Sequence, residues 1–358
     1  MLSARKAVLH LQEYHPPLAR RDGLRLDFNE NTEGCSPLVL AQLQKVTADD
    51  LARYPERAPV EEIVAEHLAL APEHVLLTNG VDEAIHLLCE AYLEPHDEVL
   101  IVTPTFSMFE IYAAATGARV TLVQCDSDFQ FPIAKLLRSV TPATRLIAIA
   151  SPNNPTGTVA TREHVLQIAA AAPDAALLVD EAYFDFHGDT VLFDVKAIPN
   201  LFAARTFSKA YGLAGLRIGI LAGPREQMPM VRRVSSPYSV NAVALAILPV
   251  ALADSEYLSG YVAQVRSGRE RLQQELRSLG IQAWPSHANF LLLRIGGLHR
   301  EFVAAMRARG ILVRDRSSDP GCDGCVRITV GTAEQTDRLI TALRKVALEL
   351  KLGTKVTE

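Results

Sequence analysis

Seven short apolar segments between residues 74 and 223 limit what this chain can fold into. They are residues 74–78, 98–104, 118–125, 145–152, 176–183, 201–208 and 216–223. Most are continuously apolar rather than alternating, which is typical of strands that are buried on both faces of a sheet. Helical patterns, such as those of residues 82–93 and 162–172, lie between several of them. This alternation predicts an α/β fold with a doubly wound, mostly parallel sheet.

The chain length and a change of pattern after residue 224 predict a second, smaller domain. A chain of 358 residues suits about two domains. Further apolar and helical segments follow at residues 255–279, 289–295, 299–309, 311–314, 326–330 and 333–349. We therefore expect a large domain at residues 46–255 and a smaller α/β domain formed by residues 1–45 and 256–358.

Charge and cysteine content favour a cytoplasmic enzyme. The formal net charge of -5 gives no electrostatic reason to expect nucleic acid or an anionic membrane as a partner. No apolar run reaches the ~18 residues of a membrane span, and the five cysteines have no disulfide-framework spacing. Cys322 and Cys325 form a lone Cys-x-x-Cys, which favours a glycine-containing turn before a strand over a metal or redox site. We expect free thiols and no metal site.

Polar residues follow the predicted strands at the carboxyl edge of the sheet, where open α/β sheets bind their ligands. Residues 78–83 pass through Gly80 into a helix whose first N–H groups can hold a phosphate. Residues 151–157, SPNNPTG, form a turn whose amides can point into the same site.

Asp180 and Tyr183 suggest a site for a cationic aromatic ring. A carboxylate at a strand end can pair with a protonated pyridine nitrogen, and a tyrosine hydroxyl can bond the ring's phenolate oxygen. The same apolar-Asp-Glu pattern occurs in P-loop ATPases, but those need a Gly-Lys pair in their phosphate loop, and this chain has none.

Lys209 directly follows a predicted buried strand. A buried lysine is unfavourable unless it is neutralised or bonded, and a Schiff base does both. Thr206, Ser208 and Arg217 flank it with two hydroxyls and a guanidinium fork, which suit phosphate oxygens.

Together these residues resemble the fold-type I aminotransferases of class II, which depend on pyridoxal 5'-phosphate (PLP), and most of all their histidinol-phosphate branch. The supporting strings are LDFNEN (26–31), RYPE (53–56), TNGVDEAIHLL (78–88), SPNNPTG (151–157), VDEAYFDF (179–186), SKAYGLAGLR (208–217), ILVRD (311–315) and VRITVGT (326–332). The resemblance implies a three-layer large domain, PLP as cofactor and a homodimer with shared active sites. It implies transfer of an amino group from histidinol phosphate to 2-oxoglutarate, a step of histidine biosynthesis.

The resemblance also implies residue roles. Lys209, Asp180 and Tyr183 are implied to be catalytic. The implied cofactor-binding residues are Val81, Asp82, Phe106, Asn154, Asp180, Tyr183, Thr206, Ser208, Lys209 and Arg217, with Tyr54 reaching the cofactor of the neighbouring subunit. The implied substrate-binding residues are Tyr14, Asn154, Arg314 and Arg327.

Two other activities share most of these motifs: an aromatic amino-acid aminotransferase, and a PLP decarboxylase or lyase of the same fold. In this chain Phe106 lacks a hydroxyl that some family members have, and residues 29–37 lack a proline that commonly follows the second asparagine. A few pocket residues decide among these substrates.

Overall fold

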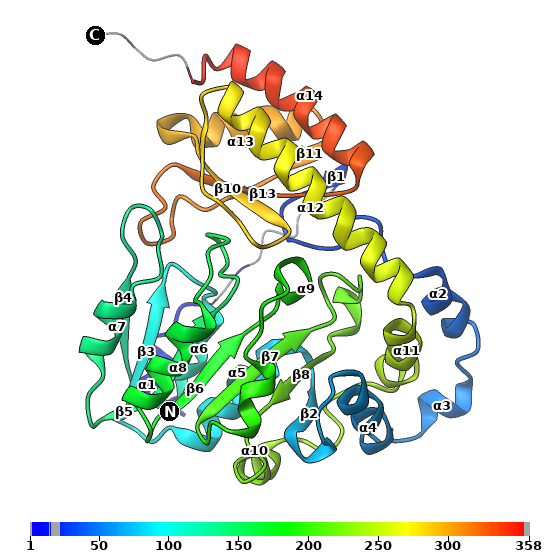
Figure 1. Ribbon diagram of the computed structural model, residues 1–358, viewed down its shortest axis with the longest axis vertical. Helices are drawn as coiled ribbons and strands as arrows, with labels where there is room; N and C mark the ends of the chain where they lie inside the picture. Colours follow the sequence, from blue (N-terminus) through cyan, green and yellow to red (C-terminus); the bar gives the residue numbers. More distant parts are fainter. Residues whose placement is uncertain (1, 14, 16–21, 354–358) are drawn as a thin grey trace.

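The computed structural model describes residues 2–13, 15 and 22–353, and a seven-stranded sheet forms its centre (Figure 1). Its strands, in spatial order, are β2 (Val75–Thr78), β8 (Gly219–Ala222), β7 (Leu201–Thr206), β6 (Ala176–Asp180), β5 (Thr144–Ala150), β3 (Glu98–Thr103) and β4 (Arg119–Gln124). Strand β8 runs antiparallel to both of its neighbours, and the other pairs are parallel. The predicted α/β fold with a mostly parallel sheet is confirmed.

Helices cover both faces of this sheet because each strand is apolar on both sides. Leu76 lies in the core cluster of one face and the adjacent Leu77 in that of the other. The helices of the Leu77 face are α4 (Ala58–His67), α7 (Ile133–Ser139), α8 (Arg162–Ala171) and α11 (Ala242–Ala253). Those of the Leu76 face are α5 (Gly80–Tyr92), α6 (Met108–Thr116) and α10 (Met228–Val234). Edge strand β4 departs from the expectation of full burial, since most of its side chains are at least partly exposed.

Local signals set several helix boundaries. The Thr161 hydroxyl accepts a hydrogen bond from the His164 amide (3.2 Å) and so caps the start of α8. Asn241 caps α11 in the same way, through the Ala244 amide (2.8 Å). Helix α6 ends at Gly117, whose left-handed conformation favours glycine.

A smaller sheet lies above the carboxyl edge of the large one (Figure 1). Its antiparallel strands, in order, are β12 (Arg314–Asp315), β13 (Cys325–Thr329), β10 (Phe290–Arg294) and β9 (Gln282–Ala283). The helices that pack with it are α12 (Ser255–Ser278), α13 (His299–Ala308) and α14 (Ala333–Glu349). The single segment expected at residues 311–314 is instead two short strands, because β11 (Ile311–Leu312) pairs with β1 (Leu24–Arg25) in a separate sheet.

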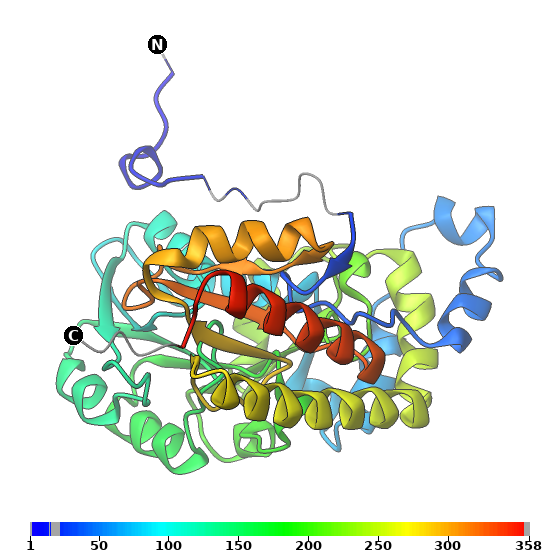
Figure 2. The same cartoon turned by 90° about the horizontal axis from the view of Figure 1, so that it is seen from above.

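The N-terminal segment contacts both parts of the molecule. Strand β1 pairs with β11, whereas Val39 lies in a core cluster of the large sheet. The first 52 residues also contain the short helices α1 (Lys6–Leu9), α2 (Pro37–Leu43) and α3 (Ala48–Ala52). Figure 2 shows α1 projecting from the body, where the Arg5 guanidinium donates to the Ala115 carbonyl (2.9 Å). The boundaries at residues 45 and 255 remain a prediction.

One helix pair resembles a membrane span in length and composition. Within the described ranges no single helix is long and apolar enough to cross a membrane. Helices α11 and α12 meet that criterion only together, with a bend of 77° between them.

Candidate active site

The candidate site residues lie where the large sheet meets the small one. Asp180 and Thr206 are the last residues of the adjacent strands β6 and β7. From the small sheet, Val326 and Ile328 of β13 face the small-domain core. Because successive strand residues point to opposite faces, Arg327 between them faces away from that core.

Lys209 lies in the loop after β7 and contacts the N-terminal segment. Its Nζ donates to the Phe28 carbonyl (3.3 Å) and lies 5.8 Å from the centroid of the Tyr183 ring. The Tyr183 hydroxyl accepts a hydrogen bond from Nδ2 of Asn29 (2.9 Å). Two of the three predicted catalytic side chains are thus held by the same short segment.

Asp180 is a buried carboxylate, with 5% of its surface exposed. Its Oδ1 accepts a hydrogen bond from the Ala182 amide (2.9 Å), and no side chain in the described part of the chain forms an ion pair with it. Burial raises the pKa of its carboxyl to about 7, an effect that the Ala182 amide opposes. A cationic ring nitrogen would offset this cost, so the site fits a pyridinium partner.

A polar cluster at the start of α5 suits a phosphate. Arg217 donates to the Asp82 carboxylate (2.9 Å) and lies 3.5 Å from the Ser208 hydroxyl, which in turn accepts a hydrogen bond from Thr206 (2.9 Å). Gly80 opens α5 with a φ of 72°, and a Cβ there would lie 2.7 Å from the Arg217 guanidinium. Glycine leaves this approach open, and Val81 follows it in the first helical turn, whose N–H groups can bind an anion.

Arg327 and Arg314 occupy directly opposed positions on β13 and β12. Arg327 is buried, and it donates to the Asp27 carbonyl (2.7 Å) and to the side-chain oxygen of Asn154. Burial, together with repulsion by Arg316 and Arg314, lowers its pKa to about 10. The Arg314 guanidinium lies 5.3 Å from the centroid of the Phe28 ring.

Three further predicted residues are Phe106, Tyr54 and Tyr14. Phe106 follows β3 and packs edge-on against Phe109, with ring centroids 6.1 Å apart. Tyr54 is 79% exposed and stacks on Tyr238 at 4.5 Å. Tyr14 lies outside the described residues.

Sequence reasoning missed the roles of residues 27–29. Asn29 is the main omission, since it contacts Tyr183 and also accepts a hydrogen bond from the Thr329 hydroxyl (3.0 Å). Its φ of 56° is in the left-handed region, which asparagine tolerates better than most residues. The two asparagines of LDFNEN were the available signal, but nothing in their local sequence indicates contacts with residues so distant in the chain.

Cys322 and Cys325 are both buried free thiols. They close a turn in which the Cys325 amide donates to the Cys322 carbonyl (2.8 Å), and β13 begins there. Among the described residues no group of three or more His, Cys, Asp or Glu side chains could hold a metal ion.

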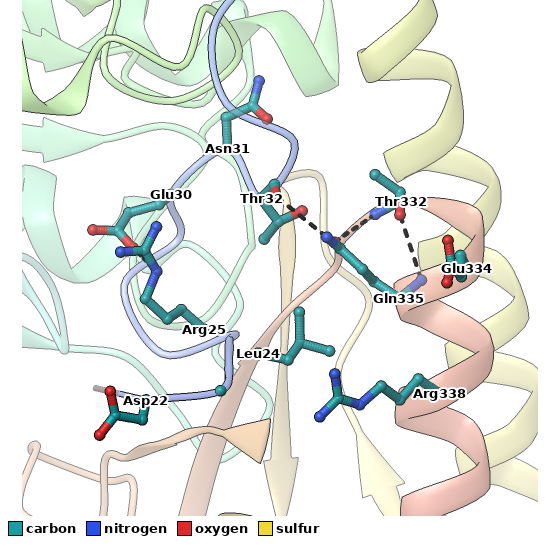
Figure 3. Close-up of a pocket in the computed structure, with 11 residues that line it drawn as sticks. Asp22, Leu24, Arg25, Glu30, Asn31, Thr32, Thr332, Glu334, Gln335 and Arg338 are labelled. Carbon is teal, nitrogen blue, oxygen red and sulfur yellow. Dashed lines mark hydrogen bonds and ion pairs between the residues drawn. The ribbon is translucent and has the colours of Figure 1, made fainter. Parts of the chain in front are cut away.

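A cavity of about 640 Å³ adjoins residues 22–32 and the start of α14 (Figure 3). Arg25 and Glu30 form an ion pair in it (3.7 Å), and the Gln335 side chain bonds the backbone of Thr32 and Thr332. None of the predicted site residues lines this cavity.

Comparison with known proteins identifies similar chains over nearly the whole length. Residues 21–343 match the family Aminotransferase class I and II. The histidinol-phosphate aminotransferase of Roseiflexus castenholzii is 36% identical over 96% of this chain and 98% of its own, and that of Dehalococcoides mccartyi is 35% identical over 89% of each. The solved histidinol-phosphate aminotransferase of Sinorhizobium meliloti, in complex with pyridoxal-5'-phosphate, has a TM-score of 0.87 and 25% identity, covering 96% of this chain and 97% of its own.

The raised pKa of Asp180 predicts a pH dependence of stability in the cofactor-free protein. The unfolded carboxyl titrates near 3.8 and the folded one near 7, so the folded state retains a proton that the unfolded state has released. The contribution of Asp180 to stability is therefore fully present below pH 3.8 and is lost as the pH rises through 7. Relative to Asp180→Asn, the wild type should lose up to about 4 kcal/mol of unfolding free energy over this range.

Denaturant unfolding of both proteins between pH 4 and 8 measures this difference. Asp128→Asn, which removes an exposed carboxylate, is the matched control. A constant difference between wild type and Asp180→Asn across this range would contradict the assignment.

Proposed function

Because this chain belongs to the class I and II aminotransferase family, we propose that it is a PLP-dependent enzyme that transfers the amino group of histidinol phosphate to 2-oxoglutarate. The products are imidazole-acetol phosphate and glutamate, which places the reaction in histidine biosynthesis. The observation that carries this proposal is the opposed pair Arg314 and Arg327 beside Asn154, within a chain whose curated relatives at 35–36% identity are named for this activity.

The residues present fit the cofactor. The start of α5, with Val81 and Asp82, would hold its phosphate together with Thr206, Ser208 and Arg217. Asp180 would pair with its ring nitrogen, and Tyr183 and Asn154 would bond the ring's phenolate oxygen. Phe106 would stack on the ring, and Lys209 would hold the cofactor covalently. When bound, PLP supplies an electron-withdrawing ring that weakens the bonds at the amino-bearing carbon.

The protein's own groups determine which bond is broken. With its amine free, the Nζ of Lys209 would act as the base that removes the proton from the amino-bearing carbon of the substrate. With a cationic ring nitrogen beside it, the buried Asp180 carboxyl would be held in its charged form, in a site where electrostatic interactions are strong. Arg327 orients the substrate through its guanidinium, which Asn154 and the Asp27 carbonyl hold in place.

The two arginines suit a pair of chemically different substrates. Histidinol phosphate carries a phosphate and no carboxylate, whereas glutamate carries carboxylates and no phosphate. A guanidinium fork pairs bidentately with either group. One pocket with Arg314 and Arg327 can therefore accept both substrates in turn.

We further propose that the enzyme is a homodimer with shared active sites and acts in the cytoplasm. Support for the dimer comes from the exposed stack of Tyr54 on Tyr238 and from exposed apolar side chains nearby in sequence, Leu38, Leu40, Leu43 and Leu51. Five free thiols fit the reducing environment of the cytoplasm.

Lys209→Ala should abolish covalent retention of PLP and turnover while the protein remains folded. Borohydride reduction of the wild type, followed by peptide mapping, should place the cofactor on Lys209. Lys196→Ala, a change at a lysine on the exposed side of the large domain, is the control and should retain the label. A label on any other lysine would overturn the assignment.

Tyr54 is predicted to contact the cofactor phosphate of the partner subunit. Mixing Tyr54→Phe chains with Lys209→Ala chains should then create hybrid dimers with one doubly altered site and one intact site. Activity should rise above the sum of the two preparations. If subunit exchange is demonstrated and activity does not rise, Tyr54 serves its own subunit or neither site.

Arg314→Ala should lower kcat/KM for histidinol phosphate by roughly 10- to 100-fold, the loss expected for one charge-assisted fork. It should affect phenylalanine much less, whereas Arg327→Ala should impair glutamate and phenylalanine as well. The measurement is kcat/KM for histidinol phosphate, histidinol, phenylalanine and glutamate. Arg300→Ala, on the exposed side of α13, is the matched control. A wild-type preference for phenylalanine would indicate an aromatic amino-acid aminotransferase instead.

A further inference from the structure

A third arginine lies on the same face of the small sheet as Arg314 and Arg327. The Arg316 amide donates to the Cys325 carbonyl (2.9 Å), which continues the antiparallel pairing of β12 with β13 to a point two residues beyond Arg314 and Arg327. Residues two apart on a strand point to the same face. The register therefore gives Arg314, Arg316 and Arg327 one common face, away from the small-domain core.

Arg316 forms an ion pair with Asp319, at the other end of a tight turn. The Asp319 amide donates to the Arg316 carbonyl (2.9 Å), and both side chains are largely buried, with 14% and 19% exposed. Burial raises the pKa of the Asp319 carboxyl, whereas attraction by Arg316, Arg327 and Arg314 opposes that rise. The carboxylate is thus the counter-charge of the whole arginine group and not of Arg316 alone.

This group has unused hydrogen-bond donors. The Nε atoms of Arg316 and Arg327 are both buried and have no acceptor among the residues that the structure describes. Buried donors without acceptors destabilise the folded protein. An anion with several oxygens would satisfy them and would reduce the repulsion among three guanidinium groups.

We propose that Arg316 is a third anion-binding residue of the substrate pocket and that Asp319 is its displaceable counter-ion. This inference rests on the proposed function for the site's location, and it adds a residue pair that sets the pocket's affinity for doubly charged groups. A phosphate dianion competes with the Asp319 carboxylate for Arg316, so Asp319 weakens binding while it stabilises the empty pocket. A carboxylate monoanion has less charge with which to compete.

The two partners therefore have opposite effects on anion binding. Arg316→Gln removes a donor and a positive charge, and it should weaken binding of sulfate, a permanent dianion. Asp319→Asn removes the competing charge but keeps an oxygen that can accept from Arg316, and it should strengthen sulfate binding. An ion pair that merely braces the turn would give changes of the same sign, accompanied by a loss of thermal stability.

The experiment is calorimetric titration of the PLP-saturated enzyme with sulfate, so that the cofactor's own phosphate site is filled. The expected dissociation constant rises roughly tenfold in Arg316→Gln, rises less in Arg316→Lys, and falls roughly three- to tenfold in Asp319→Asn. Arg344→Gln and Glu275→Gln alter an arginine–carboxylate pair on another part of the small domain and should leave sulfate binding unchanged.

The proposal is overturned if Arg316→Gln and Asp319→Asn shift sulfate affinity in the same direction, if neither shifts it, or if wild-type enzyme shows no saturable sulfate binding. Sulfate binding and turnover of histidinol phosphate are measured independently, so the two proposals can fail separately. A poor rate with histidinol phosphate alongside opposite sulfate shifts would reject the proposed function and retain the anion site. A high rate with histidinol phosphate alongside unchanged sulfate affinity in both variants would reject the anion site and retain the proposed function.

Discussion

The hydrogen bonds made by residues 26–29 connect the two parts of the molecule, and the candidate site depends on them. The Phe28 carbonyl accepts from Lys209 of the large domain, and the Asp27 carbonyl accepts from Arg327 of the small sheet. Asn29 bonds Tyr183 on one side and Thr329 on the other. Backbone groups vary little in position once paired, so this segment fixes the reacting groups of one domain relative to the anchoring groups of the other.

The site is electrostatically polarised. Asp180 provides buried negative charge at the edge of the large sheet, and the arginines of β12 and β13 provide positive charge on the small sheet. Neither charge is fully neutralised by its own domain, which is costly in a protein interior and is therefore typical of binding sites. A cationic cofactor ring beside Asp180 and an anionic substrate group beside the arginines would stabilise both charged regions at the same time.

The sequence predicted what depends on local pattern. Apolar segments, most of them continuous, predicted the seven strands of the large sheet, and parallel strands bring Asp180, Thr206 and Lys209 to one edge. What it could not predict depends on contacts between distant segments. Asn29 and Thr329 are 300 residues apart. The register of β12 on β13 is what places Arg316, and with it the Arg316–Asp319 pair, on the same face as Arg327. Edge strand β4 carries Arg119 and Gln124 at its ends and pairs on one side only, so both its composition and its place in the sheet leave it exposed.

The N-terminal segment lies far along the chain from the residues that it contacts, and this separation affects the order in which the site forms during translation. Strand β1 pairs with β11, and Thr329 lies 300 residues beyond Asn29, so these partners are among the last parts of the chain to be translated. At about 5–20 residues per second, residues 26–29 leave the ribosome roughly 15–60 s before Thr329 does. The large sheet, whose last strand ends at Ala222, is complete well before then. A nascent chain can therefore carry Asp180 and Lys209 at the edge of the large sheet while the strands that bear Arg314 and Arg327 are still being synthesised.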